Sequence, residues 1–234
     1  MQKKKILILP SDTPHPAYID SIISPLAFLE TEYSLHPIDS LSIMEELSNE
    51  QFYSHWQEKL SQYIPHYDAF FGFSFGGVIL QQCFSLFTHL NKPLILFSAP
   101  SFADQSLAQK LGEVITLCNE YKIDEALHSL YQHVYYPNEI PLQTHQITDK
   151  ELAAKRIIYG LTRVLETDST SIIKENQVKH LHLIGELSHL VNKDNVLTPH
   201  QGTLLSVPEA GMRILRDNLP FCKKVILEAL NGAI

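Results

Sequence analysis

The chain has 234 residues, which is enough for one domain with a full hydrophobic core. Its formal charge of −8 argues against nucleic acid as a partner, and no apolar run reaches the roughly 18 residues that a membrane span requires. The three cysteines (Cys83, Cys118 and Cys222) are far apart and odd in number, so neither a disulfide framework nor a metal knuckle is expected. The apolar run after the basic start is shorter than the roughly 7–15 residues of a signal peptide, so we expect a cytoplasmic protein.

Strand and helix patterns alternate through the first hundred residues. Continuous apolar runs, typical of strands buried on both faces, are followed by stretches with apolar residues at helical spacing. The expected strands cover 6–9, 33–38, 67–73 and 93–97, and the expected helices cover 17–30, 49–64 and 76–90. This alternation predicts an α/β protein with a doubly wound parallel sheet, in which ligands bind at the carboxyl ends of the strands.

The pattern changes after residue 100. From 101 to 175 the apolar spacing is helical and no sheet strand is expected. The sheet pattern then resumes with strands at 178–185 and 203–207 and a closing helix at 213–230. The sequence therefore predicts a core made of 1–100 and 176–234, with a helical cap, 101–175, inserted over the binding site.

A serine motif follows the third expected strand. The run Gly72-Phe73-Ser74-Phe75-Gly76-Gly77 leads from this strand into a helix. A turn this tight requires small neighbours, and it pushes the Ser74 hydroxyl out above the sheet at the helix N-terminus. In this context the motif predicts the nucleophile elbow of an α/β-hydrolase fold, and the alternative is a glycine turn whose serine only caps the helix.

An elbow of this kind is accompanied by an oxyanion hole made of two backbone N–H groups. The first donor would be Phe75, directly after the serine. The second would come from the loop after the first strand, around Ser11 or Asp12, where the sequence does not fix the donor.

The second half of the chain carries three further segments in a fixed order. They are Gly185-Glu-Leu-Ser-His-Leu-Val191, Val207-Pro-Glu-Ala-Gly-Met212 and Leu219-Pro-Phe-Cys222. Together with the elbow, they resemble the α/β-hydrolase carboxylesterases, most closely those that cleave pimeloyl-carrier-protein methyl ester in biotin synthesis; the menaquinone-pathway hydrolase-like enzymes look similar. The resemblance covers nearly the whole chain and implies a serine esterase or thioesterase without a metal or organic cofactor.

Two residues depart from the pattern of that family. The family has an acid at the third position after the glycine of the first segment and a histidine directly after the Ala-Gly of the second. These positions hold Ser188 and Met212, so the triad is degenerate. A serine hydroxyl is a poor nucleophile until a base takes its proton. In serine proteases, loss of the base lowers the rate on the order of 10⁶-fold.

Another histidine could replace the missing base. His189 is the best substitute, because it lies beside the unfilled acid position on a loop after a sheet strand; the alternative is an ordinary surface histidine. The other candidates are His128, His133 and His15 as bases, and Glu186, Asp194 and Asp104 as groups that orient a displaced base. His180 and His182 alternate on one strand without a third ligand at suitable spacing, so we expect structural histidines rather than a metal site.

Two functions remain open at this stage. The chain is either a serine carboxylesterase or thioesterase on a small acyl substrate, with Ser74 as nucleophile, or a catalytically inactive hydrolase-like binding or regulatory protein. If the resemblance extends to the substrate, an acidic acyl-carrier protein would be a partner, and a basic patch on the cap would attract it. Lys150, Lys155, Arg156 and Arg163 are the residues that could form this patch.

Overall fold

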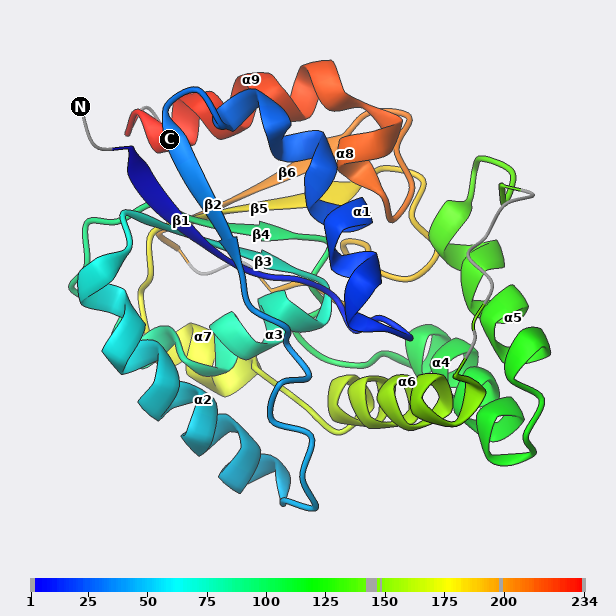
Figure 1. Cartoon of the computed structure of the whole chain (residues 1–234). Coiled ribbons are helices and arrows are strands. Elements are labelled where there is room, and N and C mark those ends of the chain that lie inside the picture. The colour runs from blue at the N-terminus through cyan, green and yellow to red at the C-terminus, as the bar shows by residue number, and fades with distance from the viewer. Residues whose placement is uncertain (1–2, 142–146, 148, 198–199, 233–234) are drawn as a thin grey trace.

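The computed structural model describes residues 3–141, 147, 149–197 and 200–232. Its centre is a six-stranded sheet in the order β2-β1-β3-β4-β5-β6, and every neighbouring pair is parallel (Figure 1). The strands are β1 (Lys4–Leu9), β2 (Tyr33–Pro37), β3 (Ala69–Phe73), β4 (Leu94–Phe97), β5 (His180–Gly185) and β6 (Gly202–Val207). The predicted parallel α/β sheet is confirmed.

Helices cover both faces of this sheet (Figure 1). On one face, α1 (Ile19–Ile23), α8 (Ile214–Asp217) and α9 (Leu219–Leu230) pack over a cluster that includes Ile6, Ile8 and Val225. On the other face, α2 (Asn49–Tyr63), α3 (Phe75–Gln82) and α7 (Thr170–Glu175) enclose a larger cluster that includes Leu7 and Trp56. The alternating residues of β1 thus point into two separate cores, as expected for a strand buried on both faces.

Three of the expected helices are interrupted. The segment expected at 17–30 consists of a short α1 between two 3-10 turns, Pro16–Tyr18 and Ser24–Leu29. Pro25 in the second turn has no N–H with which to continue the hydrogen bonds of α1. The helix expected at 76–90 ends at Gln82 and continues as a 3-10 turn, Phe84–Leu86. The closing helix is divided where Asn218 caps α9 just before Pro220.

Three helices between β4 and β5 stand beside the sheet rather than on it (Figure 1). We call α4 (Gln105–Asn119), α5 (Ile123–Tyr135) and α6 (Lys150–Leu165) the cap helices. Asp104 and Asp149 cap the starts of α4 and α6 by accepting hydrogen bonds from the backbone N–H groups of Leu107 and Leu152. The division into a core of 1–100 and 176–234 and a cap of 101–175 stays a prediction.

No helix in the described part of the chain is both long enough and apolar enough to cross a membrane.

Strand register brings the loops of the site together at one edge of the sheet. Leu9 at the end of β1 pairs with Gly72 of β3, and Phe73 of β3 pairs with Phe97 of β4. From β1 the chain first adds β2 on one side and then β3 to β6 on the other side. The carboxyl ends of β1 and β3 therefore form the topological switch point, where doubly wound folds bind ligands.

Candidate active site

Ser74 lies in the turn between β3 and α3 with φ 46° and ψ −113°. Non-glycine residues rarely adopt this backbone conformation, and it costs of order 1–3 kcal/mol. The backbone N–H of Ser74 donates to the carbonyl of Phe97, and the side chain makes no capping hydrogen bond to α3. The elbow geometry is therefore present, and a serine that only caps its helix does not account for it.

The glycines of the motif allow α3 to begin this close to the sheet. A Cβ at Gly76 would lie 2.0 Å from the carbonyl oxygen of Leu9, and a Cβ at Gly72 would lie 2.7 Å from the Cα of Gly77. Both distances are too short for any side chain. The sequence pattern thus reflects close backbone packing around the serine.

A cavity of about 330 Å³ opens above the elbow. Its wall is mostly apolar and combines the half-buried Ser74 with the loop after β1, cap helices α4 to α6 and the loop before α8. A cavity of this size with few polar groups is typical of a site for a small, largely apolar ligand.

The residues predicted to supply oxyanion donors differ in their relation to this cavity: Ser11 and Asp12 line it, whereas the buried Phe75 is not among its described lining residues. Phe75 is the first residue of α3, so its backbone N–H has no partner within the helix. Ser11 and Asp12 line the cavity from the loop after β1. The backbone N–H of Asp12 interacts with the carboxylate of the same residue.

The carboxyl of Asp12 is unusual in its own right. Its Oδ2 is shielded from solvent and has no hydrogen-bond partner among the described residues. It lies against α6 at Gly160, where a Cβ would approach the Asp12 Cβ to 2.5 Å. Burial raises the pKa of Asp12 from 3.8 to about 6, against the opposing effects of its own N–H and of Arg156.

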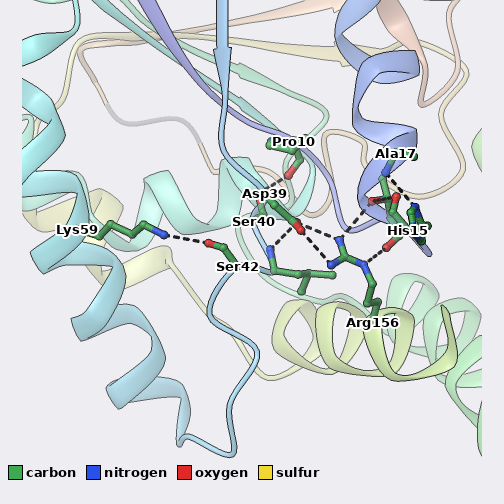
Figure 2. A network of polar contacts seen from close by, with 10 residues as sticks. Pro10, His15, Ala17, Asp39, Ser40, Ser42, Lys59 and Arg156 are labelled. Carbon is green, nitrogen blue, oxygen red and sulfur yellow. Dashed lines mark hydrogen bonds and ion pairs between the residues drawn. The ribbon is translucent and has the colours of Figure 1, made fainter. Parts of the chain in front are cut away.

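Arg156 of α6 fixes the loop that carries these residues (Figure 2). Its guanidinium forms a two-pronged ion pair with Asp39, with both N···O distances 3.0 Å, and its Nε donates to the carbonyl of Thr13 at 2.8 Å. This side chain is 4% exposed. The pair ties a cap helix to the loops after β1 and β2, which holds one wall of the cavity in place.

The prediction of a basic patch on the cap is therefore wrong for two of its four residues. Arg156 and Arg163 are buried and bond to neighbouring segments, because their long side chains reach inward from α6 to polar groups of the core. Lys150 and Lys155 are exposed but form ion pairs with Asp124 and Glu151.

Ser188 and Met212, the positions where the family resemblance expects the acid and the histidine, lie side by side. Gly185 of β5 pairs with Val207 of β6, so the loops after these strands are neighbours. Ser188 is buried, and its Oγ lies 4.0 Å from the Sδ of Met212. Met212 lines the cavity, where its thioether can neither accept nor return the proton of a serine hydroxyl.

The candidate replacement bases lie away from this centre. His189 is exposed, and its ring stacks on Tyr136 at 3.7 Å between centroids. His15 caps a 3-10 turn by accepting from Ala17 N–H, and the pKa of His133 is lowered by burial and by the nearby Lys110. His128 contacts Gln132. None of these histidines, nor Glu186, Asp194 or Asp104, is among the described residues that line the cavity.

The histidines of β5 are structural, as expected. His180 and His182 are buried, and burial lowers their pKa values to about 4 and about 3. His180 contacts the carbonyl of Val178, and the ring of His182 accepts from Ala99 N–H. Within the described residues there is no group of three potential metal ligands.

Two arginines at the cavity were missed by sequence reasoning. Arg213 and Arg216 line it from the loop and helix that follow Met212. The buried side-chain carboxyl of Asp12 was also missed, because the sequence motif points only to the backbone N–H of this residue. Arg213 could have been found from the sequence, because it directly follows Met212, where the family resemblance expects a histidine, in the loop after the last strand.

The parallel sheet, the strained elbow serine and the cavity above it define an α/β-hydrolase fold. Solved α/β-hydrolase structures superpose on nearly the whole chain. MGS-M2, an α/β-hydrolase enzyme from a Medee basin deep-sea metagenome library, has a TM-score of 0.73 and 13% identity over 99% of this chain and 90% of its own. MenH from S. aureus has a TM-score of 0.70 and 16% identity over 99% and 95%.

The esterase EaEST from Exiguobacterium antarcticum has a TM-score of 0.69 and 14% identity over 98% of this chain and 93% of its own. No protein-family model matches the sequence, and no curated protein matches it either. At these identities the likeness concerns the fold, and the chemistry has to be inferred from the residues at the elbow.

Proposed function

We propose that this protein binds a small acyl ester or thioester in the cavity above Ser74 without the turnover of a complete serine hydrolase. The observation that carries the proposal is that Met212 lines the cavity; the family resemblance expects the catalytic histidine at this position of the sequence. The neighbouring acid position is also neutral, because Ser188 faces the Met212 sulfur. A mostly apolar cavity with an elbow hydroxyl then provides binding without a base.

A small acyl compound fits this proposal better than an acyl-carrier protein. Of the four basic residues expected on the cap, two are buried and two are paired with carboxylates. These four residues therefore do not provide the unpaired positive charges that would attract an acidic carrier domain.

Slow hydrolysis by Ser74 is the second candidate, and the elbow itself favours it. In support of it, Ser74 has the strained backbone of an elbow and lines the cavity, and it directly precedes Phe75, whose N–H has no partner within α3. A displaced base such as His189 would then have to leave its stack on Tyr136 to reach the serine. A loop movement on the acyl ligand's arrival would be required for this reaction.

Labelling with a fluorophosphonate probe separates the two candidates. The purified protein is incubated with the probe beside a Ser74→Ala variant, and p-nitrophenyl octanoate hydrolysis is followed in parallel. Binding without catalysis predicts at most trace labelling and ester turnover about 10⁶-fold below that of a complete triad. Binding itself is measured by calorimetry with methyl octanoate.

Strong labelling that disappears in Ser74→Ala would refute the non-catalytic proposal and establish the hydrolase. A His189→Gln variant then tests the displaced base, since loss of labelling without loss of methyl octanoate binding would assign it. Failure of both methyl octanoate and octanoate to bind would refute both candidates for this class of ligand.

A further inference from the structure

Arg213 is the one cavity-lining arginine whose side chain forms no hydrogen bond or ion pair within the described part of the chain. The ion pairs found there involve other basic residues. Its guanidinium stacks at 4.0 Å on the ring of Tyr135, which also lines the cavity from α5. A half-buried guanidinium thus presents several unused N–H donors at the binding site.

We propose that Arg213 binds a carboxylate carried by the ligand, so that the cavity selects anionic acyl compounds over their neutral counterparts. This inference rests on the proposed function, since it specifies which acyl compounds that cavity accepts. A guanidinium can hold both oxygens of a carboxylate with two parallel hydrogen bonds, and an aromatic ring beneath it leaves its N–H edge free for this contact.

The surroundings hold Arg213 in a defined position. A Cβ at Gly211 would lie 1.7 Å from the carbonyl oxygen of Tyr136, so the end of α5 packs directly on the backbone before Arg213. Asn138 donates to Asp217 at 2.9 Å, and Asp217 also accepts from the Gly211 N–H at 2.9 Å. These contacts join the cap to the loop on both sides of the arginine, so its stack on Tyr135 is preorganised.

The other charged groups described nearby leave the N–H donors of Arg213 unused. Arg216 is positive as well and donates to Ser21 and Ser24 at the edge of the cavity. Burial raises the pKa of Asp217, while the Gly211 N–H and the nearby Arg213 guanidinium lower it. The Asp217 oxygens accept hydrogen bonds from Asn138 and from the Gly211 N–H, so Asp217 is a neighbouring charge of Arg213 but takes none of its N–H donors. Asp12 is the acid on the cavity lining, and its Oδ2 is turned against α6 rather than towards the opening. The accessible charge of the cavity is therefore positive in a protein whose net charge is −8.

The remaining wall fixes the rest of the ligand. Leu107, Leu111 and Leu130 of the cap helices line the cavity together with Met212. An alkyl chain packs well on such a surface, because binding removes its apolar surface from water and leaves no polar group without a hydrogen-bond partner. The ligand class that this arrangement favours is an aliphatic chain with a carboxylate.

Calorimetry with octanoate and methyl octanoate tests this selection. The two probes have the same chain and differ in one negative charge. We expect wild-type protein to bind octanoate about tenfold or more tightly than methyl octanoate, which is the usual range for a charge-assisted contact. In Arg213→Gln this preference should disappear, while binding of methyl octanoate stays within about twofold.

Two further variants control for charge and for folding. Lys223→Gln removes one positive charge from α9, where Lys223 lies over the ring of Phe28, and it should keep the octanoate preference. Arg213→Lys keeps the charge without the planar fork and should give an intermediate preference. Unchanged methyl octanoate binding in each variant shows that the cavity is intact.

Equal binding of the two probes by wild type, or a preference retained in Arg213→Gln, would overturn the role of Arg213 and leave the acyl cavity standing. A preference lost equally in Lys223→Gln would show a general effect of net charge and would also overturn it. Binding of neither probe would overturn the proposed function and this inference with it.

Discussion

Asp12 is a residue whose burial has a measurable thermodynamic consequence. Its pKa is raised from 3.8 to about 6 in the folded chain, mainly by desolvation. A carboxyl whose pKa is higher in the folded than in the unfolded chain destabilises the fold at pH values where it is ionised. At pH values below its pKa in the unfolded chain, it is protonated in both states and the penalty is absent. The penalty at neutral pH is about 3 kcal/mol, and it disappears as the pH falls from about 6 to below 4.

Asp12→Asn should therefore raise the free energy of unfolding by up to about 3 kcal/mol at pH 7.5 and leave it nearly unchanged at pH 3.5. Urea denaturation at the two pH values measures this difference. Asp20→Asn is the matched control, because Asp20 is exposed on α1 and should change stability by less than about 0.5 kcal/mol. A gain from Asp12→Asn that is equal at both pH values would show that ionisation is not its cause.

At the scale of single elements, two glycines in the cap helices have opposite roles. Gly160 of α6 packs directly on Asp12, whereas a Cβ at Gly112 of α4 would meet no atom within 4 Å. Glycine in a helix interior is less stable than alanine by roughly 0.5–1 kcal/mol when no contact intervenes. Only the surroundings distinguish the two positions.

We expect Gly112→Ala to stabilise the protein by about 0.5–1 kcal/mol and Gly160→Ala to destabilise it by about 1–3 kcal/mol through overpacking. Thermal unfolding of both variants measures the two effects in opposite directions. If Gly160→Ala were stabilising, α6 could move away from the loop after β1 without loss, and the close contact with Asp12 would not restrict the cap.

At the scale of the whole molecule, the three positions where the family resemblance expects a catalytic triad lie on segments that are distant in the sequence. The elbow follows β3, Ser188 follows β5 and Met212 follows β6, and the parallel register of the sheet brings their loops together. If the backbone still has the arrangement of a serine hydrolase, restoring the two missing side chains should restore the chemistry.

The double variant Ser188→Asp with Met212→His should hydrolyse p-nitrophenyl octanoate at least about 100-fold faster than wild type, a small part of what a complete triad contributes. The gain should vanish when Ser74→Ala is added, and Met212→His alone should give less than the pair. A double variant that folds and labels no better than wild type would mean that these loops no longer have catalytic geometry.

The sheet could be predicted because its signals are local. The apolar runs of β1, β3 and β4 and the glycines around Ser74 are each visible within a few residues of sequence. The cavity could not be predicted, because its wall is assembled from side chains on the loop after β1, on three cap helices and beside Met212. The inward direction of Arg156 and the stacking of Arg213 on Tyr135 depend on such distant partners.

The positive φ of Ser74 decides which inert variant is suitable for studying this site. Glycine adopts that conformation without strain, so Ser74→Gly would remove the hydroxyl and relax the turn at the same time. Alanine keeps the Cβ and with it the strained backbone. An alanine variant therefore isolates the hydroxyl, whereas a glycine variant would combine its loss with a tighter or more mobile start of α3.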